Sequence, residues 1–162
     1  MKLSFFSLAS GSSGNCYYLG TPDFGILIDA GISFRTIKKV LKDNNIDISK
    51  IAAVLVTHDH ADHIKTVGYL GEKMYLPVYT TADVHRGIDN SRYVEETLNG
   101  SRRIIQKEVP FMIRDFSIVA FEVPHDSTDN VGYHICYKDH KFTFATDVGH
   151  ITDTVKKYMS MA

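Results

Sequence analysis

Residues 57–63 read Thr-His-Asp-His-Ala-Asp-His and follow a continuous apolar run rich in β-branched residues, which is typical of a strand buried on both faces. The stretch contains four candidate metal ligands, His58, His60, Asp62 and His63. Alternate residues of an extended loop point the same way, so His58 and His60 can bind one cation. A helix that starts after them turns Asp62 and His63 toward a neighbouring position. The stretch therefore predicts one or two bound divalent metal ions.

The ligand types narrow the choice of metal. Imidazole nitrogen suits zinc, and imidazoles combined with carboxylates but no thiolate also accept Mn²⁺ or Fe²⁺. We therefore expect two divalent ions, with zinc first among the candidates. Thr57 is expected to close the strand end, and Asp59 to hydrogen-bond an imidazole from outside the ligand set.

Periodicity on both sides of this stretch predicts the fold class. Apolar alternation and β-branched runs predict strands at residues 3–8, 16–19, 25–29, 51–56, 76–80, 117–123, 131–137 and 141–146. Apolar positions at helical spacing predict helices at residues 33–44, 64–70, 81–88 and from 152 onward. Strands interrupted by isolated helices predict an α/β fold of the α+β type, with a mixed, mostly antiparallel sheet and external helices. No repeat or linker divides the chain, so residues 1–162 form one predicted domain.

The overall charge of the chain does not indicate a particular class of binding partner. The formal net charge is −1, which gives no overall attraction to nucleic acid or to anionic membranes. The amino-terminal apolar run is too short and too polar for a signal peptide or a membrane span, so a cytoplasmic protein without a membrane partner is expected. Cys16 and Cys136 lie in strand-like runs without metal-binding spacing and are expected to be buried free thiols.

The segment from His58 to His63 resembles the HxHxDH signature of the metallo-β-lactamase-fold hydrolases. The rest of the chain follows the order of that family, with Asp29 in ILIDAG, His125 in VPHDST and Asp147 in FATDVGH. The resemblance implies an αββα sandwich. It also implies that His125 and Asp147 are metal ligands together with the cluster and that Asp29 supports the site from outside.

The implied ligands divide between two metals. The first metal is expected to bind His58, His60 and His125. The second is expected to bind Asp62, His63 and Asp147, with Asp62 also acting as the catalytic residue that orients the attacking hydroxide. The last family ligand, a terminal His, has no counterpart in these residues, so tighter occupancy is expected at the first metal. His150 is an alternative replacement for that ligand.

Four stretches narrow the resemblance further. LASGSSGNCYYL, THDHADHIKTV, PHDSTDNVGY and ATDVGHITD resemble the YycJ/WalJ branch of the superfamily, bacterial proteins regarded as DNA exonucleases. The resemblance implies a phosphodiesterase that acts on DNA through a metal-bound hydroxide. Two alternatives remain open: a thioesterase or lactonase acting on small molecules, and a non-catalytic metal-binding form. Thr66 stands where thioester-cleaving relatives carry Gly, which favours the nucleic-acid branch.

Two further expectations concern a loop and the extent of the fold. The Ser/Gly loop at residues 10–15 is either an anion-binding nest suited to a phosphate or a flexible β-turn. Compared with the pattern of the family, the chain is expected to contain the amino-terminal half to two-thirds of the sandwich and to lack its carboxyl-terminal part. The exposed face of such a partial fold would be covered by a homo-oligomer.

Overall fold

The computed structural model describes residues 3–11, 13–124, 130–145 and 157. The predicted ligands His125 and Asp147, the alternative ligand His150 and the predicted helix from residue 152 lie outside these residues. Their roles stay predictions.

A six-stranded sheet forms the centre of the molecule. Its strands are β1 Ser4–Ala9, β2 Cys16–Gly20, β3 Gly25–Ile28, β4 Ile51–Leu55, β5 Val78–Thr80 and β6 Arg102–Ile104, paired in that order. The first three strands are antiparallel, and β3 to β6 are parallel. Because β3 and β4 are parallel neighbours, their carboxyl-terminal ends lie at the same edge of the sheet.

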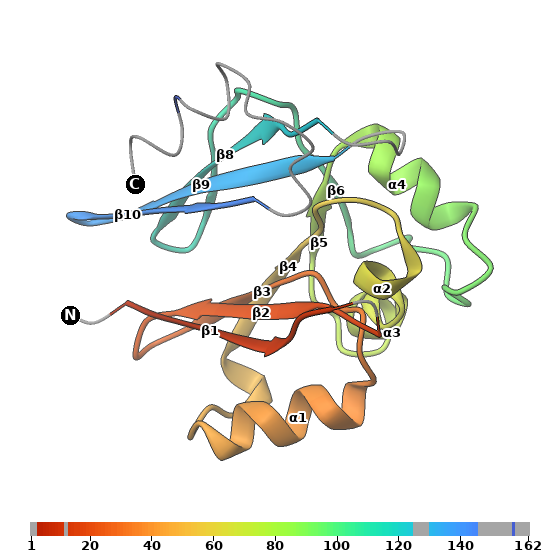
Figure 1. The fold of residues 1–162 in the computed structure, drawn as a ribbon, viewed down its shortest axis with the longest axis horizontal. Coiled ribbons are helices and arrows are strands. Elements are labelled where there is room, and N and C mark those ends of the chain that lie inside the picture. The colour runs from red at the N-terminus through yellow and green to blue at the C-terminus, as the bar shows by residue number, and fades with distance from the viewer. Residues whose placement is uncertain (1–2, 12, 125–129, 146–156, 158–162) are drawn as a thin grey trace.

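A second, antiparallel sheet packs against the first one. It contains β7 Phe111–Ile113, β8 Phe116–Glu122, β9 Val131–Tyr137 and β10 His140–Phe144, in the order β10-β9-β8-β7. Figure 1 shows the two sheets as separate layers, with helices on the side of the first sheet that faces away from the second. The helices are α1 Phe34–Asp43, α2 Ala61–Ile64, α3 Val67–Glu72 and α4 Ala82–Asp89, with a 3₁₀ turn, η1, at Ile48–Lys50.

The continuous apolar sequence of β4 has a direct structural reason. Val54 faces the core between the helices and the first sheet, where it packs with Ile37 and Leu70. Its neighbour Leu55 faces the core between the two sheets, where it packs with Tyr133 and other residues of the second sheet. Both faces of the strand are therefore buried, and its carboxyl end is fixed from both sides.

The α/β sandwich and most predicted elements agree with the structure. One prediction was wrong in detail, because the helix expected over residues 64–70 is two short helices, α2 and α3, that meet at Thr66. The break occurs where the Thr66 amide donates to the carbonyl of Ala30, 2.8 Å away, instead of to a helical carbonyl. The short strands β6 and β7 were not predicted, since each has three residues and an exposed apolar side chain, Ile104 or Met112.

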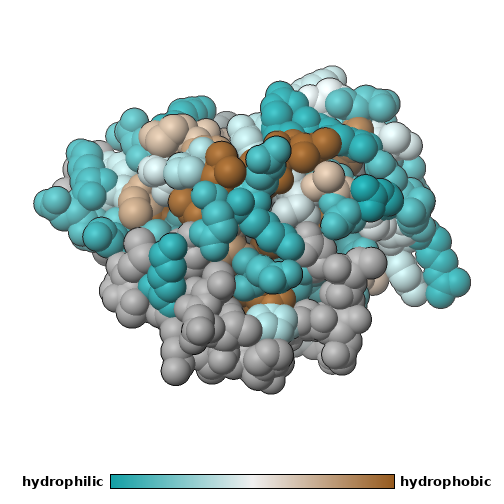
Figure 2. All heavy atoms as spheres, turned by 90° about the horizontal axis from the view of Figure 1, so that it is seen from above, coloured by the Kyte–Doolittle hydropathy of each residue, from teal (hydrophilic) through white to brown (hydrophobic). Residues whose placement is uncertain are grey.

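The described surface is mixed in character. On the face shown in Figure 2, apolar residues are separated by hydrophilic ones. None of the helices in the described residues has the length and apolar character needed to cross a membrane. The homo-oligomer expected from the sequence stays a prediction.

Candidate metal centre

The candidate centre begins where the neighbouring strands β3 and β4 end. Ile28 pairs with Leu55, so the residues that follow these strands, Asp29 and Thr57, are brought to the same edge. Asp29 is fully buried and has a φ of 64°, a left-handed conformation that Asp tolerates better than most residues. Its amide donates to the carbonyl of Leu55 at 2.7 Å, which holds this backbone in place.

The Asp29 carboxylate forms three hydrogen bonds with residues of the motif. Oδ1 accepts from the amide of Thr57 at 2.8 Å, and Oδ2 accepts from the Thr57 hydroxyl at 2.8 Å. The same Oδ2 lies 2.6 Å from Nδ1 of His63. Asp29 therefore holds Thr57 and the ring of His63 in place, and its role outside the metal-ligand set stays a prediction.

These bonds define which ring nitrogens carry protons. The Thr57 hydroxyl gives its only proton to Asp29, so its oxygen accepts from Nδ1 of His58, 2.9 Å away. Nδ1 of His63 likewise donates to Asp29. In a neutral imidazole with a proton on Nδ1, Nε2 carries the lone pair. Nε2 is therefore the nitrogen with which both rings would bind a metal.

The three imidazoles of the motif lie side by side. The ring centroids of His58 and His63 are 4.0 Å apart, and those of His58 and His60 are 4.7 Å apart. His58 and His63 are buried whereas His60 is exposed, so the cluster runs from the interior to the surface. Oδ2 of Asp62 lies 3.7 Å from Nε2 of His63. The four predicted ligands of residues 57–63 thus lie near one another, and their binding of a metal stays a prediction.

Asn15, which sequence reasoning did not identify, contacts Asp62 directly. Its backbone amide donates to the Asp62 carbonyl at 2.7 Å, and its side-chain Nδ2 donates to Asp62 Oδ2 at 3.1 Å. The only signal in the sequence is a polar residue between a Gly-rich loop and the buried strand β2. The anion-binding role predicted for that loop stays a prediction.

Two hydrogen bonds tie α2 and Thr66, which follows it, to the loop after β3. The amide of Ala30 donates to the carbonyl of His63 at 2.8 Å, and the Thr66 hydroxyl donates to the carbonyl of Ile32 at 2.5 Å. Between them, Gly31 packs so closely on α2 that a methyl group there would overlap the carbonyl of Asp62. Thr66, singled out as a family marker, therefore also stabilises the loop beside the motif.

Other polar residues near the motif have distinct surroundings. The side chain of Asp59 lies against Gly87 of α4, where a methyl group would overlap its carboxylate. The imidazole contact predicted for Asp59 stays a prediction.

His85 of α4 is buried, and its Nε2 lies 2.9 Å from the carbonyl of Arg103. Burial lowers the pKa of His85 and favours its neutral form.

The two cysteines differ in exposure. Cys16 is fully buried, and burial raises the pKa of its thiol far above the usual range. Cys136 is half-buried. Both are free thiols, as predicted, but only Cys16 is fully enclosed.

The donor set fits a metal in its chemistry. Within residues 3–11, 13–124, 130–145 and 157, no group of three or more His, Cys, Asp or Glu side chains is close enough to hold an ion by itself. The fit lies in the orientation of His58 and His63, because metal-binding histidines typically donate their other ring N–H to a carboxylate or similar acceptor.

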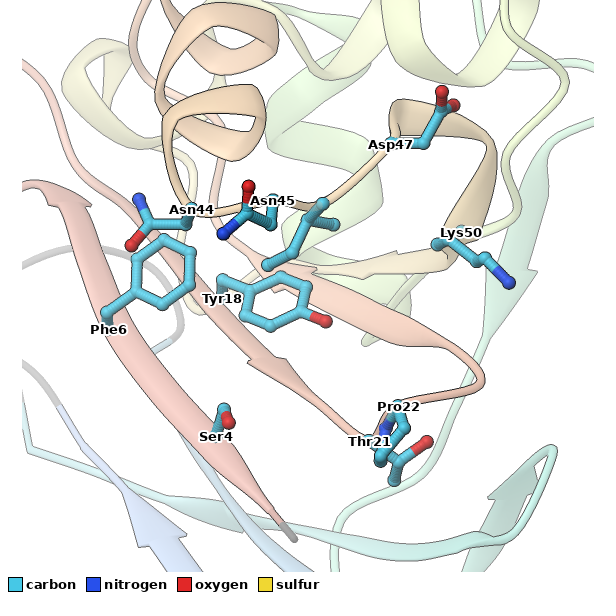
Figure 3. A pocket seen from close by; sticks show the side chains of 10 residues that line it. Ser4, Phe6, Tyr18, Thr21, Pro22, Asn44, Asn45, Asp47 and Lys50 are labelled. Atoms are coloured by element: carbon cyan, nitrogen blue, oxygen red, sulfur yellow. The ribbon is translucent and has the colours of Figure 1, made fainter.

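A separate cavity of about 410 Å³ lies at the opposite end of β4 from the motif. Figure 3 shows it between β1, β2 and the loop after α1, with the rings of Phe6 and Tyr18 at its wall and Lys50 at its edge. None of the predicted metal ligands that the structure describes, His58, His60, Asp62 and His63, lines this cavity.

Known proteins share this sequence pattern. Exodeoxyribonuclease WalJ of Streptococcus pneumoniae serotype 2 (strain D39) is 34% identical over 146 residues, covering 90% of this chain and 54% of the relative. Exodeoxyribonuclease YycJ of Bacillus anthracis is 31% identical over 156 residues, covering 96% of this chain and 58% of the relative. The chain thus spans about half the length of these relatives, and the resemblance to the YycJ/WalJ branch is confirmed.

The fold has counterparts among solved structures. Zn²⁺-bound PqqB from Methylobacterium extorquens superposes with a TM-score of 0.73 at 17% identity, covering 88% of this chain and 56% of that one. The β-lactamase superfamily domain matches residues 25–162. The chain therefore belongs to the β-lactamase superfamily domain family and has the metallo-β-lactamase fold of its hydrolases.

Proposed function

We propose that this chain carries the metal-binding part of a phosphodiesterase that hydrolyses DNA as an exonuclease. The observation that carries the proposal is the bonding of Asp29 and Thr57, which directs Nε2 of both His58 and His63 toward metal binding. A purely structural histidine cluster has no need for this shared orientation.

The metal ligands of the proposal are the four residues of the motif and two more that the family resemblance supplies. These are His58, His60, Asp62, His63, His125 and Asp147. When bound, two divalent ions lower the pKa of a water molecule and neutralise charge on the phosphate oxygens. Zinc is the first candidate, with manganese or iron as alternatives.

The residues of the chain prepare the site for this chemistry. The Asp62 side chain is 32% exposed, so its carboxylate can accept a hydrogen bond from the attacking water and hold it in place. His58 is fully buried on the inner side and excludes solvent there. The exposed His60 leaves the outer side open to a large substrate such as a polynucleotide.

Residues around the segment that contains His125 support its assignment to the same centre. The amide of Val131 donates to the carbonyl of Thr57 at 2.9 Å, which joins the start of β9 to the motif. The amide of Val123 donates to the carbonyl of Asn130 at 2.9 Å, so the two ends of that segment meet. The described residues that flank this segment therefore lie next to the metal-binding stretch.

The names of the relatives support DNA as the substrate, and a digestion assay tests the proposal. Metal-loaded chain is incubated with 5′-labelled duplex DNA, single-stranded DNA and RNA of the same sequence. We expect wild type to release nucleotides from DNA ends and His60→Ala and Asp62→Ala to lose this activity. His140→Ala and Asp43→Ala, which alter exposed residues of β10 and α1, are the matched controls and should retain it.

Other outcomes identify the alternatives. Equal DNA digestion by wild type and both motif variants would contradict the proposal. Turnover of small thioesters or lactones without DNA digestion would support a small-molecule hydrolase with the same ligands. Stoichiometric metal binding without hydrolysis of any of these substrates would support a non-catalytic form of this chain.

A further inference from the structure

We propose that Asn15 is a positioning residue that sets the direction of the Asp62 carboxylate and thereby the affinity of the second metal position. The inference rests on the proposed function, because it concerns the same site. It adds a residue that lies 47 positions before Asp62 and outside the HxHxDH motif.

Asn15 is hydrogen-bonded to Asp62 through both its backbone amide and its side chain. The Asn15 amide donates to the Asp62 carbonyl at 2.7 Å. The side-chain Nδ2 lies 3.1 Å from Oδ2 of the carboxylate and 3.3 Å from the same carbonyl. Asn15 thus holds both the backbone at the start of α2 and the side chain that projects from it.

The side chain of Asn15 is itself held on every side. An amide side chain has two N–H donors and an oxygen with two acceptor positions. Nδ2 donates to the carbonyl of Gly11 at 2.9 Å in addition to Asp62. Oδ1 accepts from the Gly11 amide at 3.1 Å and from the Tyr17 hydroxyl at 3.3 Å. Asn15 therefore cannot rotate without losing several bonds, and it is only 7% exposed.

The backbone of Asn15 is also hydrogen-bonded to the loop after β3, which contacts α2 as well. Its carbonyl accepts from the amide of Gly31 at 2.9 Å, and the neighbouring amide of Ala30 donates to the carbonyl of His63. Asn15 and the loop after β3 therefore hold α2 from two adjoining positions. A residue fixed in this way determines where Asp62 points, rather than adapting to it.

Asp62 needs such a support because α2 has only four residues and the carboxylate is partly exposed. With Oδ2 accepting from Asn15, the carboxylate is fixed in one orientation beside Nε2 of His63. Replacing residues that orient metal ligands typically lowers metal affinity about 10–100-fold. The same range is expected for Asn15→Ala at the second metal position.

The test compares Co²⁺ affinity and the Co²⁺ absorption spectrum of wild type, Asn15→Ala, Asn15→Asp and Thr66→Ala at a temperature where all are folded. Thr66→Ala is the matched control, since Thr66 stabilises the adjoining loop through Ile32 without contacting the Asp62 carboxylate. Asn15→Asp keeps the acceptor for the Gly11 amide but replaces the donor to Asp62. It provides the answer if Asn15→Ala does not fold.

We expect the second Co²⁺ to bind about 10–100-fold more weakly to Asn15→Ala, the spectrum to change in Asn15→Asp, and Thr66→Ala to match wild type in both measurements. Wild-type affinity and spectrum in both Asn15 variants, or an equal loss in Thr66→Ala, would overturn the inference and leave the proposed function intact. Absence of Co²⁺ and Zn²⁺ binding by wild type would overturn the proposed function itself, and the inference with it.

Discussion

Oδ2 of Asp29 lies 2.6 Å from Nδ1 of His63, inside a fully buried network that also holds Thr57. In Asp29→Asn, an amide group replaces one acceptor oxygen and faces an N–H or O–H donor. A buried polar group left without its partner costs about 1–3 kcal/mol, and the free energy of unfolding should fall by that amount. Urea unfolding of the metal-free chain measures it.

Asp47→Asn is the control for that substitution. Asp47 is exposed and accepts from the amide of Ser49 at 2.8 Å, as the cap of η1. Asn is as good a cap as Asp, so stability should change little. Equal losses in the two variants would contradict a special role for the Asp29 network.

The close packing of Gly31 on α2 gives a second prediction. In Gly31→Ala, the added methyl group meets the carbonyl of Asp62 and the amide of His63, which are backbone atoms that cannot turn aside. Overpacking of this kind costs about 1–3 kcal/mol and should shift α2. Gly100→Ala is the matched control, because nothing lies within 4 Å of a methyl group there. Thermal unfolding of both variants tests this, and equal melting temperatures would exclude the predicted overlap.

His85 predicts a pH dependence of stability. Burial lowers its pKa, so below the ordinary value of about 6.5 the unfolded chain binds a proton that the folded chain does not. The free energy of unfolding should therefore fall as the pH decreases below about 6.5, by at most about 1.4 kcal/mol per pH unit from this group. His85→Gln keeps a donor for the Arg103 carbonyl and should flatten this decrease. The exposed His140→Gln should leave it as in wild type, and identical pH curves for all three proteins would refute the assignment.

The two thiols predict a difference in chemical labelling. The thiolate is the reactive form, and the buried Cys16 has a strongly raised pKa whereas Cys136 is half-buried. Iodoacetamide should label Cys136 first and Cys16 only on unfolding. Mass spectrometry of tryptic peptides identifies the labelled residue, with Cys136→Ser as the control. Rapid labelling of Cys16 in the folded chain would contradict the packing of β2.

Local pattern was sufficient to find the motif and the strand before it. Residues 57–63 form a contiguous sequence signal. The uninterrupted apolar run that contains Leu55 predicts a strand buried on both faces. Asp29 required the family order, because a single Asp after a strand is more often a turn residue. Once β3 and β4 are known to be parallel neighbours, the meeting of Asp29 and Thr57 follows directly.

Contacts between segments that are distant in the sequence could not be predicted from the local sequence pattern. Asn15 and Asp62 are 47 residues apart, and neither periodicity nor spacing connects a Gly-rich loop to a later helix. The break at Thr66 also depends on a tertiary bond, to the carbonyl of Ala30. Both features arise from packing around α2, which the sequence pattern alone represents as a regular helix.

We propose that His58 and His63 bind metal through Nε2 while Nδ1 carries the proton. Long-range ¹H–¹⁵N NMR spectra of the zinc-loaded chain report, for each imidazole, which nitrogen is protonated and which binds the ion. We predict that Nδ1 is protonated and Nε2 is bound to zinc in both residues. A proton on Nε2 of either His58 or His63 in the zinc-loaded chain would contradict this mode of metal binding.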